Sequence, residues 1–257
     1  MRSFTACLNR KTANILPLVA FAVCVLAPRE THAQNSSPVT ACLSAAQNVS
    51  LGAKLPRTAA ALRSRLPLKI VAIGSSSTVG LWMTDHAKTY PEVMKRELIR
   101  LMPAARIEIV NSGRSGDTIQ SNMARFEADV FAHKPDLVVW QMGGNDFTWL
   151  ESGESLQKKI AAGIQSIRAK GADVILMDQQ YTPMILATQY AKIQGAIAGA
   201  ARQEGIGHFP RFDLMRNAVA AGVPFLALSS LDGLHMSENG YDCIGRALAR
   251  AIAAAVN

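Results

Sequence analysis

The chain has 257 residues, of which 49% are hydrophobic and 18% are charged. This length is enough for one domain with a substantial core, and the composition excludes an intrinsically disordered chain. The formal charge of +8 comes from basic residues that stand singly or in pairs. No basic stripe interleaved with aromatic residues is visible, so nucleic-acid binding is not expected.

The N-terminal segment, 1–33, has the layout of a secretory signal peptide. Basic residues precede an almost wholly apolar run, 13–27, and small residues occupy the first and third positions of the Thr-His-Ala stretch at 31–33. We therefore expect cleavage after Ala33, export to the bacterial periplasm or out of the cell, and no stable membrane span in the mature chain.

Two alternatives to a cleaved signal peptide stay open. An uncleaved membrane anchor is one, although the apolar run is shorter than the roughly 20 residues that a membrane span needs. A lipoprotein anchor at Cys24 is the other, although the bulky Val23 precedes it. Cleavage would remove four basic residues and one acid, which leaves 23 basic and 18 acidic residues and a net charge of +5.

Export also changes what the cysteines can do. Cleavage leaves Cys42 and Cys243 in the mature chain. Two cysteines in an oxidising compartment can pair, so we predict a disulfide that ties an N-terminal extension to the last helix. Two buried free thiols are the alternative.

The chain after the signal peptide divides into an extension, 34–66, and a domain, 67–257. The extension shows no strand pattern and is expected to hold a short helix near 56–65. In the domain, apolar runs alternate with helical patterns, which indicates an open parallel sheet with helices on both faces. The predicted strands are Leu68–Ile73, Arg106–Asn111, Asp136–Met142, Ala172–Asp178 and Gly207–Phe212, and the predicted helices are Tyr90–Leu101, Gln120–Ala132, Glu154–Lys170, Thr188–Glu204 and Asn239–Val256.

Ligands of such sheets bind beyond the carboxyl ends of the strands, so the loops there are the candidates for chemistry. The first, GSSSTVG at 74–80, places three serines at the start of a helix, where backbone N–H groups and the helix dipole favour developing negative charge. A serine nucleophile would benefit from this setting. On this loop alone, simple capping of the helix is the better interpretation.

The next two loops carry weaker signals. The stretch NSGRSGDT at 111–118 has glycines that let a backbone N–H approach a ligand closely, and GGND at 143–146 places an asparagine amide at a strand end. Each stretch alone is also ordinary turn chemistry.

The last loop, LDGLHMSENG at 231–240, is more specific. Asp232 and His235 are three residues apart, so in a tight turn the carboxylate can reach the imidazole Nδ1–H and fix its tautomer. Metal binding is the rival interpretation. The other histidines of the mature chain show no ligand spacing with His235, so no metal site and no cofactor are expected.

Taken together, the four loops resemble the SGNH hydrolase superfamily, also called the GDSL esterase/lipase family. The stretches NSGRSGDT and QMGGND are most similar to its bacterial periplasmic thioesterase/lysophospholipase branch. The resemblance runs from about Leu68 to the C-terminus. It implies a three-layer α/β/α flavodoxin-like sandwich with an open, parallel five-stranded sheet.

By position, the resemblance implies a triad of Ser76, Asp232 and His235. It implies an oxyanion hole formed by the N–H groups of Ser76 and Gly116 and by the Asn145 amide. Two departures from the family pattern stand out. Ser75 replaces the usual aspartate before the nucleophile, and Met236 replaces a common proline after the histidine, which is expected to loosen that turn slightly.

The function that follows is a serine hydrolase that cleaves O-acyl or thio-esters through an acyl-enzyme. The substrate is expected to be a small-molecule, lipid or glycan ester, and the chain a monomer. One alternative is a carbohydrate O-acetyl esterase acting on envelope glycans. Another is a non-catalytic acyl-glycan-binding envelope protein, which only the two departures support. Residues that could line an acyl pocket, or that could instead simply pack in the core, are Trp82, Met83, Phe147, Trp149 and Tyr181.

Overall fold

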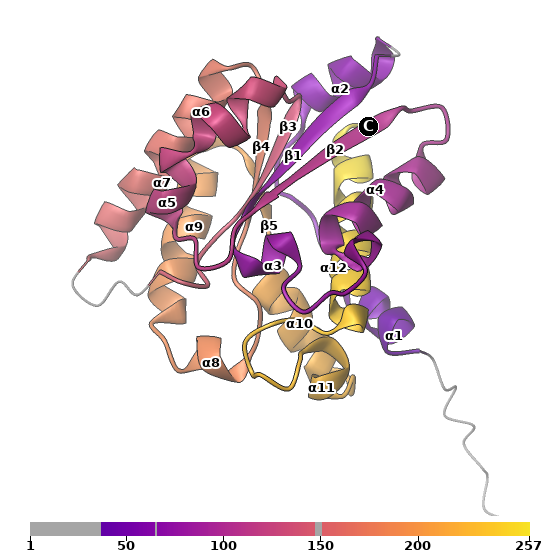
Figure 1. The fold of residues 1–257 in the computed structure, drawn as a ribbon, viewed down its shortest axis with the longest axis vertical. Helices are drawn as coiled ribbons and strands as arrows, with labels where there is room; N and C mark the ends of the chain where they lie inside the picture. Colours follow the sequence, from indigo (N-terminus) through magenta and orange to yellow (C-terminus); the bar gives the residue numbers. More distant parts are fainter. Residues whose placement is uncertain (1–36, 65, 147–150) are drawn as a thin grey trace, which may run out of the picture. The chain divides into compact units, whose positions relative to one another are not determined.

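A computed structural model describes residues 37–64, 66–146 and 151–257 of the chain. Within these residues, five parallel strands form one sheet in the order β2-β1-β3-β4-β5 (Figure 1). The carboxyl ends of parallel strands lie at one edge of a sheet, so the loops that follow them meet there. The predicted open, parallel, five-stranded sheet is confirmed. Its strands are β1 (Leu68–Gly74), β2 (Ile107–Gly113), β3 (Leu137–Gln141), β4 (Asp173–Met177) and β5 (Gly207–Phe209).

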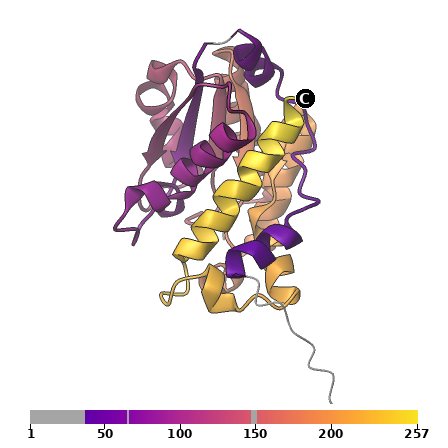
Figure 2. The same cartoon turned by 90° about the vertical axis from the view of Figure 1, so that its right-hand side faces the viewer.

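Helices cover both faces of the sheet, which gives the three layers expected (Figures 1 and 2). On one face α4 packs against α12, and α1 lies across α12; on the other face α7 packs against α9. The helices of eight or more residues are α1 (Pro38–Ala45), α2 (Pro56–Arg63), α4 (Tyr90–Leu101), α7 (Gly153–Ala169), α9 (Tyr190–Glu204), α10 (Arg211–Ala220) and α12 (Glu238–Ala255). The shorter ones are α3 (Ser76–Val79), α5 (Ile119–Ala124), α6 (Phe126–Asp129), α8 (Pro183–Leu186), α11 (Phe225–Leu228) and the 3-10 turns η1 (His86–Lys88) and η2 (Phe131–His133).

The core has two halves, one on each side of the sheet. In β1, Ile70 and Ala72 pack into the cluster under α4 and α12, whereas Val71 and Ile73 pack into the cluster under α7 and α9. Successive side chains of a strand point to opposite faces, so a strand covered on both faces must be apolar throughout. This is why the buried strands are continuous apolar runs in the sequence.

The segment before β1 belongs to the same compact unit, which spans 36–257. Leu51 and Leu55 are buried in the core cluster that contains α12, and the Leu55 N–H donates to the Ala255 carbonyl at 3.3 Å. A disulfide joins Cys42 of α1 to Cys243 of α12, the pairing expected from the sequence.

The fifth predicted strand, Gly207–Phe212, is too long. It ends at Phe209, and α10 begins at Arg211. Pro210 lies between them and has no N–H to donate to the strand ladder. Two residues further on, the Phe212 N–H donates to the Asp178 carboxylate at 3.0 Å and not to a strand.

The predicted continuous helix Gln120–Ala132 is also wrong, because the structure breaks it into α5, α6 and η2. The breaks fall at Arg125 and at Val130, where the backbone leaves the helical region. The Arg125 side chain turns back toward the sheet edge, where it takes part in the candidate site. Elsewhere in the described part of the chain, no helix is both long and apolar enough to cross a membrane.

Candidate active site

Three side chains from two loops that are distant in the sequence meet beyond the carboxyl end of β1. Ser76, at the start of α3, places its Oγ 2.8 Å from Nε2 of His235. Nδ1 of His235 lies 2.6 Å from Oδ2 of Asp232. A carboxylate can only accept, so the Nδ1 proton faces Asp232 and Nε2 is left to take the Ser76 proton. This arrangement can turn a serine hydroxyl into a nucleophile.

The Asp232 carboxylate is held by its own loop. Oδ1 accepts the N–H groups of Leu234 and His235, both at 2.9 Å, and the Ser230 hydroxyl at 2.6 Å. Burial acts to raise the pKa of the Asp232 carboxyl. Hydrogen bonds from the Ser230 hydroxyl and from the backbone and ring of His235 outweigh it and hold that pKa well below its ordinary range. Asp232 is therefore ionised wherever His235 acts as a base.

The neighbouring serines of GSSSTVG have other partners. The N–H and hydroxyl of Ser75 donate to Oε1 of Gln141 at 2.9 and 3.0 Å, and the Thr78 hydroxyl donates to the same oxygen at 3.0 Å. Ser77 donates to Gln180 at 3.3 Å. Of the three hydroxyls, Ser76 alone reaches the imidazole.

The two remaining residues of the expected oxyanion hole lie on adjacent loops. Nδ2 of Asn145 donates to the Asp117 carbonyl at 2.9 Å. Because an amide nitrogen carries two protons, one stays available for a ligand. Gly116 has a φ of 84°, which a residue with a side chain rarely adopts, and the space that its Cβ would occupy is open. The backbone conformation, and not a neighbouring atom, therefore favours glycine at position 116.

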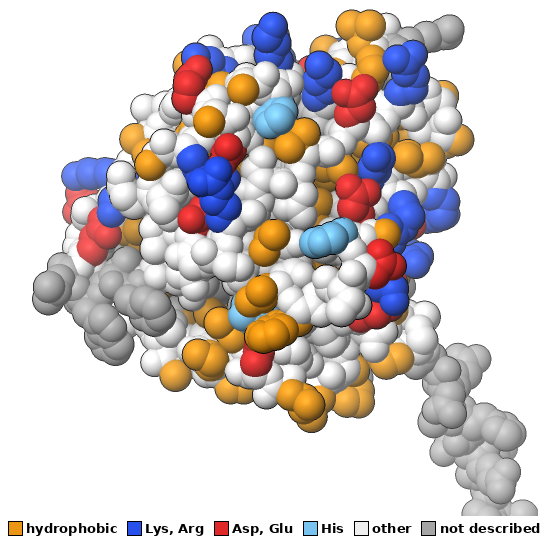
Figure 3. All heavy atoms as spheres, in the orientation of Figure 1, with side chains coloured by type: hydrophobic (Ala, Val, Ile, Leu, Met, Phe, Trp, Pro, Cys, Tyr) orange, Lys and Arg blue, Asp and Glu red, His pale blue; other side chains and the backbone are white. Residues whose placement is uncertain are grey.

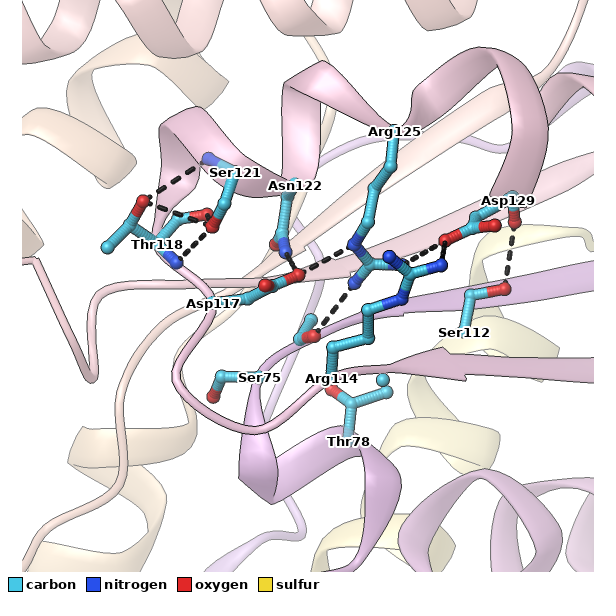
Figure 4. A network of polar contacts seen from close by, with 12 residues as sticks. Ser75, Thr78, Ser112, Arg114, Asp117, Thr118, Ser121, Asn122, Arg125 and Asp129 are labelled. Carbon is cyan, nitrogen blue, oxygen red and sulfur yellow. Dashed lines mark hydrogen bonds and ion pairs between the residues drawn. The ribbon is translucent and has the colours of Figure 1, made fainter.

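Arg125 links the loop that holds Gly116 to the end of β1, just before Ser76 (Figure 4). Its guanidinium binds Asp117 at 2.6 Å and Asp129 at 2.9 Å, and it donates to the Gly74 carbonyl at 3.1 Å. The side chain is 9% exposed, so the charge is largely shielded from water. Arg125 therefore joins the residue after Gly116 to the last residue of β1 in one charged network.

Asp146 orders the loop that carries Asn145. Its two carboxylate oxygens accept the N–H groups of Ile119, at 2.9 Å, and Gly143, at 3.1 Å. Burial raises the pKa of Asp146, although these two bonds oppose the rise. The loop after β3 is thus fixed to the start of α5, beside the second loop of the site.

A buried arginine contacts the loop of His235 through a glutamine. Arg211 is fully buried and donates to the Asp178 carbonyl and to Oε1 of Gln180, both at 2.9 Å. Gln180 in turn donates to the Leu234 carbonyl at 2.7 Å. Burial lowers the pKa of Arg211, against the attraction of Asp178. The cation thereby fixes the glutamine that holds the residue before His235.

Sequence reasoning did not identify Gln141, Arg125 or Arg211 as part of this site. Gln141 had a visible signal, since it is a polar residue at the end of the apolar run DLVVW. Arg125 and Arg211 had none, because an arginine is usually on the surface. Met236, which stands where the family has a common proline, is fully buried and pairs with Ser229 through a β-bridge.

The residues expected to line an acyl pocket behave differently from one another. Trp82 is 66% exposed and donates from Nε1 to Oδ2 of Asp232 at 2.9 Å. Tyr181 packs edge-to-face against Phe212, with ring centres 5.2 Å apart, and lies against the core. Phe147 and Trp149 lie outside the described residues.

The fold and this loop geometry define a class of α/β proteins with a Ser-His-Asp relay at the edge of a parallel sheet. The chain belongs to the non-GDSL lipase-like family, whose family model matches residues 41–257. This confirms the resemblance to SGNH hydrolases.

Known proteins are similar over parts of the chain. Esterase TesA of Pseudomonas aeruginosa is 36% identical over 94 residues, which are 35% of this chain and 46% of the relative. Arylesterase of Vibrio mimicus is 26% identical over 115 residues, 45% of this chain and 56% of the relative. The matches thus span about half the length of these relatives. The crystal structure of the acetylxylan esterase Axe2 from Geobacillus stearothermophilus shares the fold, with a TM-score of 0.60 at 22% identity over 72% of this chain and 93% of that one.

Proposed function

We propose that this protein is a serine hydrolase that cleaves carboxylic esters or thioesters through an acyl-enzyme. One observation carries the proposal: the Ser76 hydroxyl, the His235 ring and the Asp232 carboxylate stand in line at 2.8 and 2.6 Å. The names of the relatives, an esterase and an arylesterase, agree with it.

Acylation begins when Oγ of Ser76 attacks the ester carbonyl and His235 takes the hydroxyl proton at Nε2. The carbonyl oxygen becomes negative and is bound by the N–H groups of Ser76 and Gly116 and by the Asn145 amide. The first N–H groups of a helix have no acceptor within the helix, which suits the Ser76 N–H to this role. The intermediate then expels the alcohol or thiol, which receives the proton from His235.

Deacylation repeats the sequence with water. His235 takes a proton from water, the hydroxide attacks the acyl carbonyl, and the same donors bind the oxyanion. Collapse of this second intermediate releases the acid, and His235 returns the proton to Ser76. Asp232 stays ionised throughout and stabilises the imidazolium that forms twice per cycle.

The surface around Asp232 and His235 favours apolar esters. Large exposed hydrophobic side chains on or against this loop are Trp82, Met184 and Leu231. Trp82 donates to the Asp232 carboxylate, and the Met184 N–H donates to the Gly233 carbonyl. Leu231 directly precedes Asp232 in the sequence. Hydrophobic side chains also gather in Figure 3 over the region where Figure 1 shows α8 and α11. Exposed apolar patches mark surfaces that bind apolar groups of a ligand, a membrane or another protein.

An ester panel tests both the activity and this preference. We expect the mature protein to hydrolyse p-nitrophenyl esters and to prefer butyrate and longer chains to acetate and to acetylated xylan. Hydrolysis of acetylated sugars alone would instead support a carbohydrate O-acetyl esterase. Absence of turnover on the whole panel, with no labelling by a fluorophosphonate, would contradict the proposal and favour a non-catalytic acyl-glycan-binding protein.

We further propose export, with residues 1–33 as a signal peptide removed after Ala33. These residues lie outside the described part of the chain. The Cys42–Cys243 disulfide supports the proposal, because disulfides persist in oxidising compartments. N-terminal sequencing of protein from the periplasmic fraction of an expressing bacterium should begin at Gln34. An intact Met1 in a membrane fraction would contradict it.

A further inference from the structure

Trp82 has an unusual backbone for so large a residue. Its φ is 72°, a left-handed conformation that is unfavourable for residues with a side chain. Lys134 is the other non-glycine residue with a positive φ in the described part of the chain. Strained backbone of this kind persists where the surroundings hold it, and it is frequent at functional sites.

The turn before Trp82 is fastened to the nucleophile itself. The Ser76 carbonyl accepts the N–H groups of both Gly80 and Leu81 at 3.0 Å, and the Met83 N–H donates to the Gly80 carbonyl at 2.9 Å. The backbone of Trp82 therefore has a fixed position relative to Ser76.

The side chain of Trp82 crosses to the other arm of the triad. Its Nε1–H donates to Oδ2 of Asp232 at 2.9 Å, the same oxygen that receives Nδ1–H of His235 at 2.6 Å. The three donors of the Asp232 loop all bind Oδ1. Because Trp82 is 66% exposed, core packing does not explain its conformation.

We propose that Trp82 is a positioning residue of the triad. The turn bonded to the Ser76 carbonyl holds the indole, and the indole N–H orients Oδ2 of Asp232 toward His235. Trp82 thus connects Ser76 with Asp232, the first and last residues of the triad. The inference rests on the proposed ester hydrolase function. The rest of the indole ring is exposed and can contact a substrate. Loss of the N–H should therefore act on kcat, and loss of the ring on KM.

The test compares kcat and KM of Trp82→Phe, Trp82→Ala and wild type on p-nitrophenyl butyrate. Phenylalanine keeps an aromatic ring and loses the donor, so we expect kcat to fall about tenfold, as for one hydrogen bond to a charged group, with KM little changed. Alanine loses both, so we expect the same fall in kcat and a higher KM. Leu66→Ala is the matched control, because Leu66 is also 66% exposed and precedes the opposite end of β1; it should match wild type.

A second measurement does not depend on turnover. The chain has three tryptophans, so its indole ¹⁵N–¹H spectrum is simple to assign. We expect the Trp82 indole proton to move upfield in Asp232→Ala and to stay in place in Leu66→Ala. An unmoved signal in Asp232→Ala, or wild-type kcat in Trp82→Phe, would overturn the inference. A wild type that neither turns over esters nor reacts with a fluorophosphonate, yet shows the expected indole shift, would overturn the proposed function instead.

Discussion

Ser75 and Gln141 explain how the chain does without the family aspartate. Oε1 of Gln141 accepts three donors, the N–H and hydroxyl of Ser75 and the hydroxyl of Thr78. Ser75 is 4% exposed and Gln141 is fully buried. A buried acceptor surrounded by donors is satisfied without a charge. The serine is therefore matched to the glutamine, which the pattern of the first loop alone could not reveal.

Restoring the family residue should consequently destabilise the protein. In Ser75→Asp a buried carboxylate faces Oε1 of Gln141, and two acceptors repel each other. Turning the amide round would leave the backbone N–H of residue 75 without an acceptor, whereas the Thr78 hydroxyl would keep the Tyr90 hydroxyl as a partner at 3.1 Å. We expect a loss of about 1–3 kcal/mol in the free energy of unfolding, measured by urea denaturation. Ser75→Ala should cost about 1 kcal/mol; an equally stable Ser75→Asp would contradict this account.

Asn145 should matter for rate and little for stability. Asn145→Ala removes one oxyanion donor, which typically costs about 2.7–4 kcal/mol of transition-state stabilisation. We expect kcat to fall by roughly a hundredfold or more, with a circular dichroism spectrum like that of wild type. A fall of less than about threefold would remove Asn145 from the oxyanion hole.

Asp232 should make the free energy of unfolding decrease in acid. Its pKa is lowered in the folded state, below the unfolded value of about 3.9. The ionised carboxylate therefore stabilises the fold above that value, and this contribution is lost as the pH falls through the lowered pKa. Urea midpoints from about pH 2 to about pH 7 should decline below roughly pH 4, and decline less steeply in Asp232→Asn. Parallel curves for the two proteins would contradict the assignment.

At the scale of elements, the apolar runs predicted all five strands because a doubly covered parallel sheet requires them. The helices were less predictable. α4 begins and ends at the predicted residues, whereas the helix predicted over 120–132 is broken at Arg125 by contacts with Asp117 and Gly74. Such contacts join residues far apart in the sequence, and no local pattern reports them. α1 and α10 were missed for a related reason, since tertiary packing fixes them.

The link between α1 and α12 should be a major source of stability. The Cys42–Cys243 disulfide closes a sequence separation of 201 residues, and cross-links of this kind typically contribute about 2–5 kcal/mol. Cys42→Ala with Cys243→Ala should lower the melting temperature while kcat stays close to that of wild type, because neither sulfur contacts the triad. A reducing agent should lower the melting temperature of wild type and leave that of the double variant unchanged. An equal melting temperature in the double variant would contradict a stabilising role.

At the scale of the whole molecule, the topology assembles the site. The loops that carry Ser76, Gly116, Asn145 and the Asp232–His235 pair follow different elements but meet at one sheet edge. The meeting of the three loops that follow β1, β2 and β3 was predictable, because parallel strands end at one edge of the sheet. The Asp232–His235 loop instead follows α11, so the strand pattern alone does not place it. The supports of the site were not predictable. Arg125, Arg211 and Trp82 act through side chains that cross between loops, and their reach is set by the fold rather than by spacing along the chain.

The most direct test of the central claim is fluorophosphonate labelling of the three serine variants of the first loop. Ser76→Ala should lose labelling and ester turnover together. Ser75→Ala and Ser77→Ala should still label, because their hydroxyls bind Gln141 and Gln180 rather than His235. Labelling and turnover that persist in Ser76→Ala, or that vanish only in one of its neighbours, would contradict the account.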